Sequence, residues 1–169
     1  MMRIFLIGFM GCGKSTMGKK LAQKLGYTFV DLDHEIEKSL GSTIGAYFAS
    51  HGEDAFRELE SETLKTFDYP ANAVIATGGG APCFFDNMDW MNENGLSLYI
   101  EMSPAALAKR LESGKDKRPL LKDLTEAQMI EFIENKLNER NVFYQRALLK
   151  INGINLTADA MRAAVLSWQ

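Results

Sequence analysis

Eight residues near the start of the chain combine the residue types that bind the phosphates of a nucleotide. Gly8-Phe9-Met10-Gly11-Cys12-Gly13-Lys14-Ser15 fits the pattern G-x-x-x-x-G-K-[ST] of the phosphate-binding loop (P-loop), and it directly follows the apolar run at residues 4–7. Glycines let the backbone approach phosphate oxygens, and successive N–H groups at a helix start form an anion-binding site. Lys14 can reach the β- and γ-phosphates, and the Ser15 hydroxyl suits Mg²⁺. We therefore expect the chain to bind a nucleoside triphosphate with Mg²⁺, with phosphate contacts from Gly11, Cys12, Gly13, Lys14, Ser15 and Thr16.

Acidic residues and a second glycine cluster follow the next two apolar runs. Asp31-Leu32-Asp33 ends a predicted strand at residues 27–32, and in an extended chain both carboxylates would point to the same side. One could then hold Mg²⁺ through water and the other could accept a proton from an attacking hydroxyl. Equally, the two acids could simply begin the next helix, where negative charge is favourable. Gly78-Gly79-Gly80 indicates either a close approach of the backbone to a ligand or a tight turn.

Three arginines are candidate binding cations. Arg57 has acids at helical spacing around it, which is also typical of a weak surface ion pair. Arg140 could equally be a solvated helix residue. Arg118 lies in a basic loop of the kind that can close over a triphosphate, although a solvated charge cluster would have the same composition.

Composition narrows the class of protein. The 169 residues suit one domain, and a net charge of −3 argues against a nucleic-acid-binding surface. Cys12 and Cys83 form no C-x-x-C pair, which indicates a reducing compartment with neither a disulfide scaffold nor a zinc site. Because no cleavage site follows the first apolar run and no segment has the ~18 apolar residues of a membrane span, we expect a cytoplasmic protein without membrane contact.

Strand-like and helix-like patterns alternate along the whole chain. Five strands are predicted at residues 3–7, 27–32, 73–76, 96–101 and 148–151. Helices are predicted at residues 15–25, 33–40, 43–50, 53–67 and 84–94, from 103 to about 114, from 125 to about 146, and after Thr157. This order predicts an α/β fold of the P-loop NTPase type, a doubly wound, five-stranded parallel sheet with helices on both faces. Ligands bind beyond the carboxyl ends of the strands in such folds, so the motifs could share one site.

In combination and order, these motifs resemble the shikimate kinase family over nearly the whole chain. The motifs are the P-loop, Asp31-Leu32-Asp33, Phe56-Arg57, Gly78-Gly79-Gly80, Arg118-Pro119-Leu120-Leu121 and Arg140-Asn141-Val142-Phe143-Tyr144. The resemblance implies transfer of the γ-phosphoryl group of ATP, with Mg²⁺, to the 3-hydroxyl of shikimate. It also implies a single, monomeric kinase domain at residues 1–169, with a lid at about 114–124 and a substrate-binding helical region at about 33–62.

The resemblance assigns a role to each candidate residue. Asp33 would hold the substrate hydroxyl and act as its base, while Lys14 and Arg118 would stabilise the phosphates. The shikimate site would comprise Asp33, Arg57, Gly78, Gly79, Gly80 and Arg140, with Phe48 and Phe56 lining the pocket and Glu60 holding Arg57. Ser15 would ligate Mg²⁺ with support from Asp31, and Arg110 would stack on adenine. The loop at residues 152–157 departs from the family pattern, because it has neither the arginine nor the proline expected near the adenine.

Two other functions are compatible with a P-loop. Another small-molecule kinase of the same fold, such as a gluconate or nucleoside-monophosphate kinase, would share the P-loop and the lid but would not explain Asp33, Arg57, Gly79 and Arg140 as one pocket. A guanine-nucleotide switch needs D-x-x-G and N-K-x-D elements, and neither occurs in the chain. Substrate-dependent phosphate transfer separates the kinases from each other, and a preference for GTP over ATP would indicate the switch.

Overall fold

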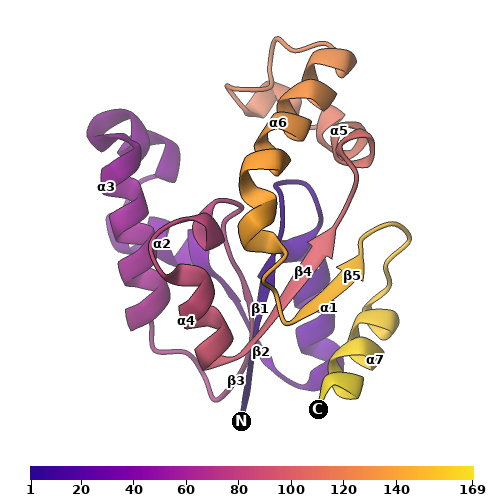
Figure 1. The fold of residues 1–169 in the computed structure, drawn as a ribbon. Coiled ribbons are helices and arrows are strands. Elements are labelled where there is room, and N and C mark those ends of the chain that lie inside the picture. Colours follow the sequence, from indigo (N-terminus) through magenta and orange to yellow (C-terminus); the bar gives the residue numbers. More distant parts are fainter.

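Five parallel strands form the centre of the molecule, and the computed structural model describes all residues from 1 to 169. The strands are β1 (Met2–Ile7), β2 (Thr28–Asp31), β3 (Asn72–Ala76), β4 (Leu96–Glu101) and β5 (Leu149–Asn152). Their order in the sheet is β2-β3-β1-β4-β5, so the P-loop strand β1 lies in the middle (Figure 1). The predicted number of strands and their parallel arrangement are confirmed.

Seven α-helices and two short 3₁₀ segments connect the strands. The helices are α1 (Lys14–Leu25), α2 (Leu32–Leu40), α3 (Ile44–Thr66), α4 (Asn87–Asn94), α5 (Pro104–Glu112), α6 (Glu126–Tyr144) and α7 (Ala158–Trp168), and the 3₁₀ segments are η1 (Ala81–Cys83) and η2 (Lys115–Lys117). The hydroxyls of Ser103, Thr125 and Thr157 cap α5, α6 and α7, and Thr125 forms a capping box with Gln128. No helix in the structure combines the length and the hydropathy that crossing a membrane requires.

Neighbouring residues of β1 face opposite helix layers. Leu6 faces α1, where a side chain at Gly18 would come within 3.0 Å of a Leu6 methyl carbon. Phe5 points to the other face, where its ring packs edge-on against Trp90 of α4 at 5.8 Å between centroids. Both side chains are fully buried, so the sheet is covered on both faces, as predicted.

The predicted end of the strand at residues 27–32 is wrong. β2 stops at Asp31 and α2 begins at Leu32, so Asp33 is helical and the argument from an extended chain fails. Asp31 caps α2 instead, because its Oδ1 accepts a hydrogen bond from the His34 N–H at 3.2 Å. The two acids therefore do begin a helix, and this placement leaves open whether they also bind metal or substrate.

Other predicted helix bounds also differ. Residues 43–50 and 53–67 form one element, α3, that is kinked at Gly52, where φ is 84°. The predicted helix at 84–94 begins only at Asn87, after η1, and α6 ends at Tyr144 rather than near residue 146. These changes leave the order of elements intact.

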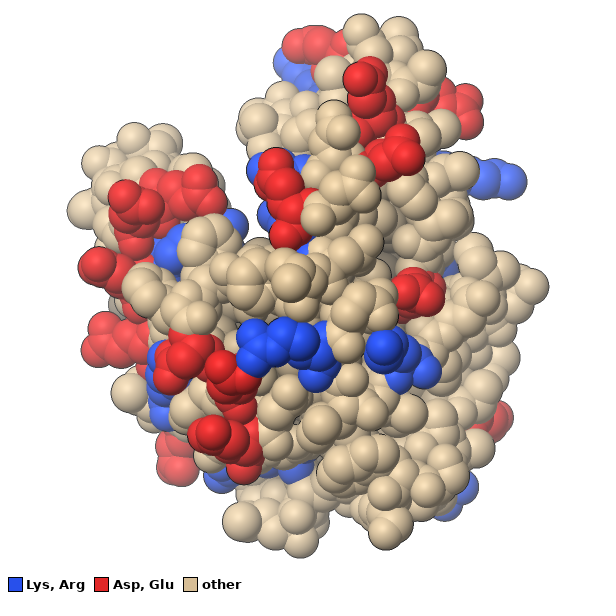
Figure 2. Space-filling model, viewed as in Figure 1, with Lys and Arg blue, Asp and Glu red and all other residues tan.

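Two projections rise above the carboxyl ends of the strands and form a cleft. α3 lies on one side, and α5 with α6 on the other (Figure 1), and the space-filling view shows the molecule hollowed between them (Figure 2). The segment between α5 and α6 contains the predicted lid. Leu121 in its middle is fully buried while Leu120 is 69% exposed, so one side chain anchors this segment to the core.

Candidate active site

A cavity of about 570 Å³ lies where β1, β2 and β3 end. Most of the residues predicted from the sequence to bind nucleotide, metal or substrate line it. They are Gly11, Gly13, Lys14, Ser15, Thr16, Asp31, Asp33, Gly78, Gly79, Arg110 and Arg118, and they are joined by Met10, Ala76 and Thr77. The fold therefore brings the P-loop, the acids after β2, the glycines after β3 and the lid arginine to one place.

Each cation of this cavity donates to a backbone carbonyl. The Lys14 amine donates to the carbonyl oxygens of Gly8 at 2.6 Å and Phe9 at 3.1 Å. Arg110 donates to the Gly11 carbonyl at 3.3 Å, and Arg118 to the Gly114 carbonyl at 3.4 Å. None of the three has a carboxylate partner. Arg110 and Arg118, with five donors each, keep N–H groups for phosphate oxygens. The Lys14 ammonium also donates to Cys12 Sγ at 3.8 Å, so all three of its donors are engaged and a phosphate would replace one or more of these contacts.

Ser15 and Asp31 form the pair of oxygen ligands that Mg²⁺ would need. The Ser15 hydroxyl donates to Oδ2 of Asp31 at 3.0 Å, and both line the cavity. The structure gathers no group of three or more His, Cys, Asp or Glu that could hold a metal ion. Magnesium on a nucleotide is held by one or two protein oxygens together with phosphates and water, so this pair fits it.

Asp33 lies beside the glycine cluster, and its carboxyl group is partly buried. A side chain at Gly78 would come within 3.1 Å of Oδ1 of Asp33. Burial raises the pKa of Asp33 above its ordinary value, the neighbouring Asp31 carboxylate adds to this, and Lys14 opposes it. A carboxylate with a raised pKa is a better proton acceptor than an ordinary one.

The three residues Gly78, Gly79 and Gly80 are glycines because neighbouring side chains leave little room for a Cβ atom at these positions. None of the three has a positive φ, so neither left-handed backbone nor the turn itself requires glycine here. An added Cβ would lie 2.9 Å from Glu60 Oε2 at the first position and 3.3 Å from Arg140 Nη1 at the second. At the third it would lie 2.6 Å from both terminal nitrogens of Arg57. With Asp33, four charged side chains thus pack directly against three successive glycines.

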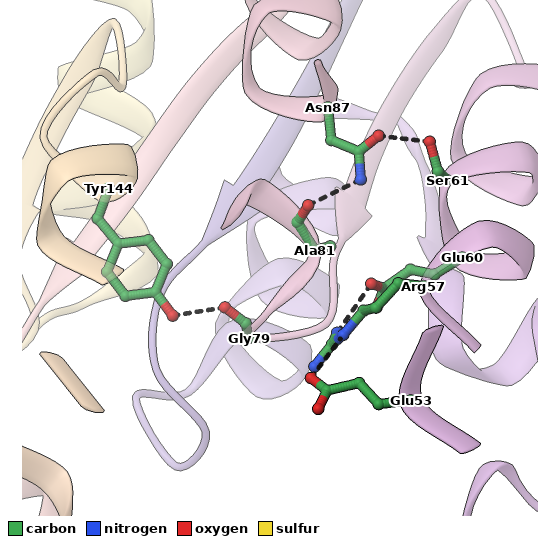
Figure 3. Close-up of polar contacts among 8 residues, drawn as sticks. All are labelled: Glu53, Arg57, Glu60, Ser61, Gly79, Ala81, Asn87 and Tyr144. Atoms are coloured by element: carbon green, nitrogen blue, oxygen red, sulfur yellow. Dashed lines mark hydrogen bonds and ion pairs between the residues drawn. The ribbon is translucent and has the colours of Figure 1, made fainter. Parts of the chain in front are cut away.

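Arg57 is held rigidly, and the interpretation as a surface ion pair is wrong. Its side chain is only 12% exposed, and Nη1 donates to Oε1 of the buried Glu60 at 2.9 Å (Figure 3). Nε lies 3.5 Å from Glu53 Oε1 without forming a hydrogen bond, and the guanidinium stacks on the Phe84 ring at 4.3 Å. Burial raises the pKa of Glu60, and the charge of Arg57 opposes the rise.

Comparison with known proteins gives the family. The family model described as Shikimate kinase matches residues 10–167. A shikimate kinase of Parabacteroides distasonis is 42% identical over 160 residues, which cover 95% of this chain and 92% of that protein. The chain belongs to the shikimate kinase family. Its reaction is accordingly the phosphorylation of shikimate with ATP as phosphoryl donor.

Solved structures agree with this family. The crystal structure of shikimate kinase from Bacteroides thetaiotaomicron has a TM-score of 0.91 at 39% identity, covering 98% of this chain and 97% of that one. A shikimate kinase from Acinetobacter baumannii in complex with shikimate has a TM-score of 0.85 at 32% identity, covering 99% and 94%. A gluconokinase from Sinorhizobium meliloti reaches only 0.58 at 15% identity, which indicates a shared fold alone. The alternative of a gluconate kinase is therefore not favoured.

Four residues that the sequence predicted for the site do not line the P-loop cavity of this shikimate kinase. The Cys12 side chain is buried, and its N–H donates to the Phe9 carbonyl at 3.2 Å within the P-loop. Arg57, Gly80 and Arg140 do not line the cavity and lie behind the glycine cluster. The guanidinium of Arg140 lies 5.4 Å from the centre of the Phe9 ring.

Sequence reasoning gave no separate role to two buried residues next to the site. Tyr144 and Asn87 donate to the carbonyl oxygens of Gly79 and Ala81, respectively. Tyr144 stood inside the motif that begins at Arg140, so its position carried a signal. Asn87 carried none, because a single asparagine at a helix start is typical of many solvent-exposed helix ends.

Proposed function

We propose that the reaction is transfer of the γ-phosphoryl group of ATP to the 3-hydroxyl of shikimate, with Mg²⁺ held at Ser15 and Asp31. One observation carries this proposal: Asp33, Arg57 and Arg140, from three different helices, converge on Gly78-Gly79-Gly80 beside the P-loop cavity. An acceptor for a hydroxyl and two cations for a carboxylate are what a small anionic alcohol requires.

Shikimate binding follows from the donors around the glycines. The planar guanidinium groups of Arg57 and Arg140 would take the carboxylate, since their N–H forks match its two oxygens. The N–H groups of Gly78, Gly79 and Gly80 donate to no backbone carbonyl and are available to substrate oxygens. Phe48 and Phe56, with ring centroids 5.8 Å apart, would supply an apolar wall for the carbon ring.

Phosphoryl transfer then needs little more than positioning. The 3-hydroxyl oxygen attacks the γ-phosphorus, the bond from that phosphorus to the β,γ-bridging oxygen breaks, and the hydroxyl proton passes to Asp33 as ADP leaves. Lys14 and Arg118 would stabilise the charge on the transferring group, and Arg110 would contact the nucleotide. Mg²⁺ supplies further neutralisation of the β- and γ-phosphates when it is bound.

Exclusion of water would come from the segment that carries Arg118. We assign residues 114–124 as a lid and residues 33–62 as the substrate-binding region of a single domain, residues 1–169. Arg118 reaches the cavity from this segment, and the buried Leu121 fixes one point about which the exposed parts can move. We infer action as a monomer in the cytoplasm, a reducing compartment in which the free Cys12 and Cys83 would stay reduced.

The test is ADP formation from Mg·ATP with and without shikimate, in the wild type, in Arg140→Ala and in Arg162→Ala. Arg162 is an exposed residue of α7 and serves as a matched control. We expect shikimate-dependent turnover, with the KM for shikimate raised about 10- to 100-fold in Arg140→Ala, because a hydrogen-bonded charge contributes roughly 1.5–3 kcal/mol. Turnover with gluconate and none with shikimate would refute the proposal.

A further inference from the structure

The end of α6 is tied to the glycine cluster by a buried tyrosine. Tyr144 is fully buried, and its hydroxyl donates to the Gly79 carbonyl oxygen (Figure 3). Its ring packs against that of Tyr99, with centroids 5.0 Å apart. Arg140 lies one helical turn earlier on the same face of α6, so the helix that carries one carboxylate-binding cation also contacts the backbone beside it.

The other end of the cluster is fixed independently. The Asn87 side chain donates to the Ala81 carbonyl at 2.9 Å and accepts from the Ser61 hydroxyl at 2.6 Å, and these groups are buried (Figure 3). Loss of the Tyr144 hydroxyl would therefore free only the peptide groups near Gly79 and not the start of η1.

The hydrogen bond from Tyr144 to the Gly79 carbonyl determines the direction in which the Gly80 N–H points. The Gly79 carbonyl and the Gly80 N–H belong to one planar trans peptide group and point in opposite directions. Figure 3 shows Tyr144 on one side of this segment and Arg57 on the other. With its carbonyl held toward Tyr144, the peptide must direct the Gly80 N–H to the side of Arg57. A peptide between two glycines has few steric limits of its own, so an external hydrogen bond is needed to hold it.

We propose that Tyr144 is a positioning residue for the substrate: its hydrogen bond to Gly79 holds the Gly79–Gly80 peptide so that the Gly80 N–H and Arg57 face the same carboxylate. The inference rests on the proposed function and deepens its account of the shikimate site. The hydroxyl is suited to permanent donation, because burial raises the pKa of Tyr144 above the usual range of a phenol.

The test is Tyr144→Phe with Tyr99→Phe as its matched control. Both variants remove one hydroxyl from the same pair of packed rings, which are tilted by 34° to each other, but it is the Tyr144 hydroxyl that donates to the Gly79 carbonyl. For Tyr144→Phe we expect the KM for shikimate to rise about 5- to 10-fold, the effect of one neutral hydrogen bond, while the KM for ATP stays within about 2-fold. Tyr99→Phe should leave both constants within that range.

Each outcome separates this inference from the function on which it rests. An irreversibly inactivated fraction of enzyme lowers kcat but leaves KM unchanged, and reversible unfolding would raise the KM for shikimate and the KM for ATP together, so the comparison of the two KM values still gives an answer. No shikimate turnover by the wild type would overturn the proposed function. Normal wild-type turnover with an unchanged shikimate KM in Tyr144→Phe would overturn only the positioning role. So would an equal rise in both KM values, or the same rise in Tyr99→Phe, since either would indicate general packing.

Discussion

Gly80→Ala changes the position of Arg57 without replacing any charged residue. Gly80 has φ of −88° and ψ of −12°, which alanine adopts without strain. Its methyl group, however, would lie 2.6 Å from Nη1 and Nη2 of Arg57 and 2.8 Å from Cζ. Ordinary contacts begin near 3.4 Å, so the guanidinium must retreat by about 1 Å. It cannot swing freely, because Glu60 and the Phe84 ring hold it.

The expected effect falls mainly on activity. A misplacement of about 1 Å in a substrate-positioning group costs roughly 10²-fold in rate, so kcat/KM for shikimate should fall by that factor. Stability should fall by only about 1–3 kcal/mol, the usual cost of overpacking, because the displaced atoms are the end of a side chain. The corresponding drop in Tm is about 2–4 °C per kcal/mol for a chain of this size.

The assay compares steady-state kinetics and thermal unfolding of Gly80→Ala with those of Gly45→Ala. Gly45 lies in α3 with only Thr43 Oγ1, at 4.0 Å, near the added methyl group, so alanine there should preserve activity and raise helix stability slightly. If Gly80→Ala kept kcat/KM within about 3-fold of the wild type, a 1 Å shift of Arg57 would be harmless and its role as a carboxylate binder would be wrong.

The remaining predictions concern two carboxyl groups, the partly buried Asp33 and the buried Glu60. Asp33→Asn should lower kcat by about 10²- to 10⁴-fold. Because the folded state raises the pKa of Asp33 above 3.8, ionised Asp33 opposes folding, so this variant should also have a higher Tm at pH 7, a gain that calorimetry should find lost below pH 3.8. Glu60→Gln leaves Arg57 without its buried partner, which costs about 3 kcal/mol, but burial also raises the pKa of Glu60, so loss of the buried negative charge offsets part of this cost; the net loss of Tm should still exceed that of Glu53→Gln at the exposed end. Equal losses of Tm in these two glutamine variants would contradict the second expectation.

The framework was predictable because its signals are local. The central strands contain short apolar runs, such as the fully buried Ile4–Ile7 part of β1, and such runs can be recognised without knowledge of their partners. Helix starts are also recognisable locally, because the hydroxyl of a capping residue accepts a hydrogen bond from the backbone N–H three residues later. Three helices begin in this way, at Ser103, Thr125 and Thr157. The P-loop is local too, so nucleotide binding could be inferred from its residues alone.

Of the predictions that failed, one concerned a local boundary and another concerned contacts between residues distant in the chain. The boundary between β2 and α2 has no linker, and the buried Leu32 continues the apolar pattern of the strand, so only the cap at Asp31 marks the change. The acids around Arg57 indicated a surface ion pair. Its burial is produced by Phe84 and Gly80, which belong to a different connection and approach it only in the folded chain.

The charges at the glycine cluster are not equivalent, and this decides which of them a ligand should engage most strongly. Arg57 already pairs with Glu60 at 2.9 Å and lies 3.5 Å from Glu53, so part of its attraction for a substrate carboxylate is offset within the protein. Arg140 has no carboxylate within ion-pair distance, and its neighbours include the Phe9 ring, the backbone near Gly79 and the Tyr144 hydroxyl. A bound carboxylate therefore gains more from Arg140, while Arg57 contributes mainly a fixed direction. Removal of Arg140 should accordingly weaken binding, whereas displacement of Arg57 should misorient what is bound.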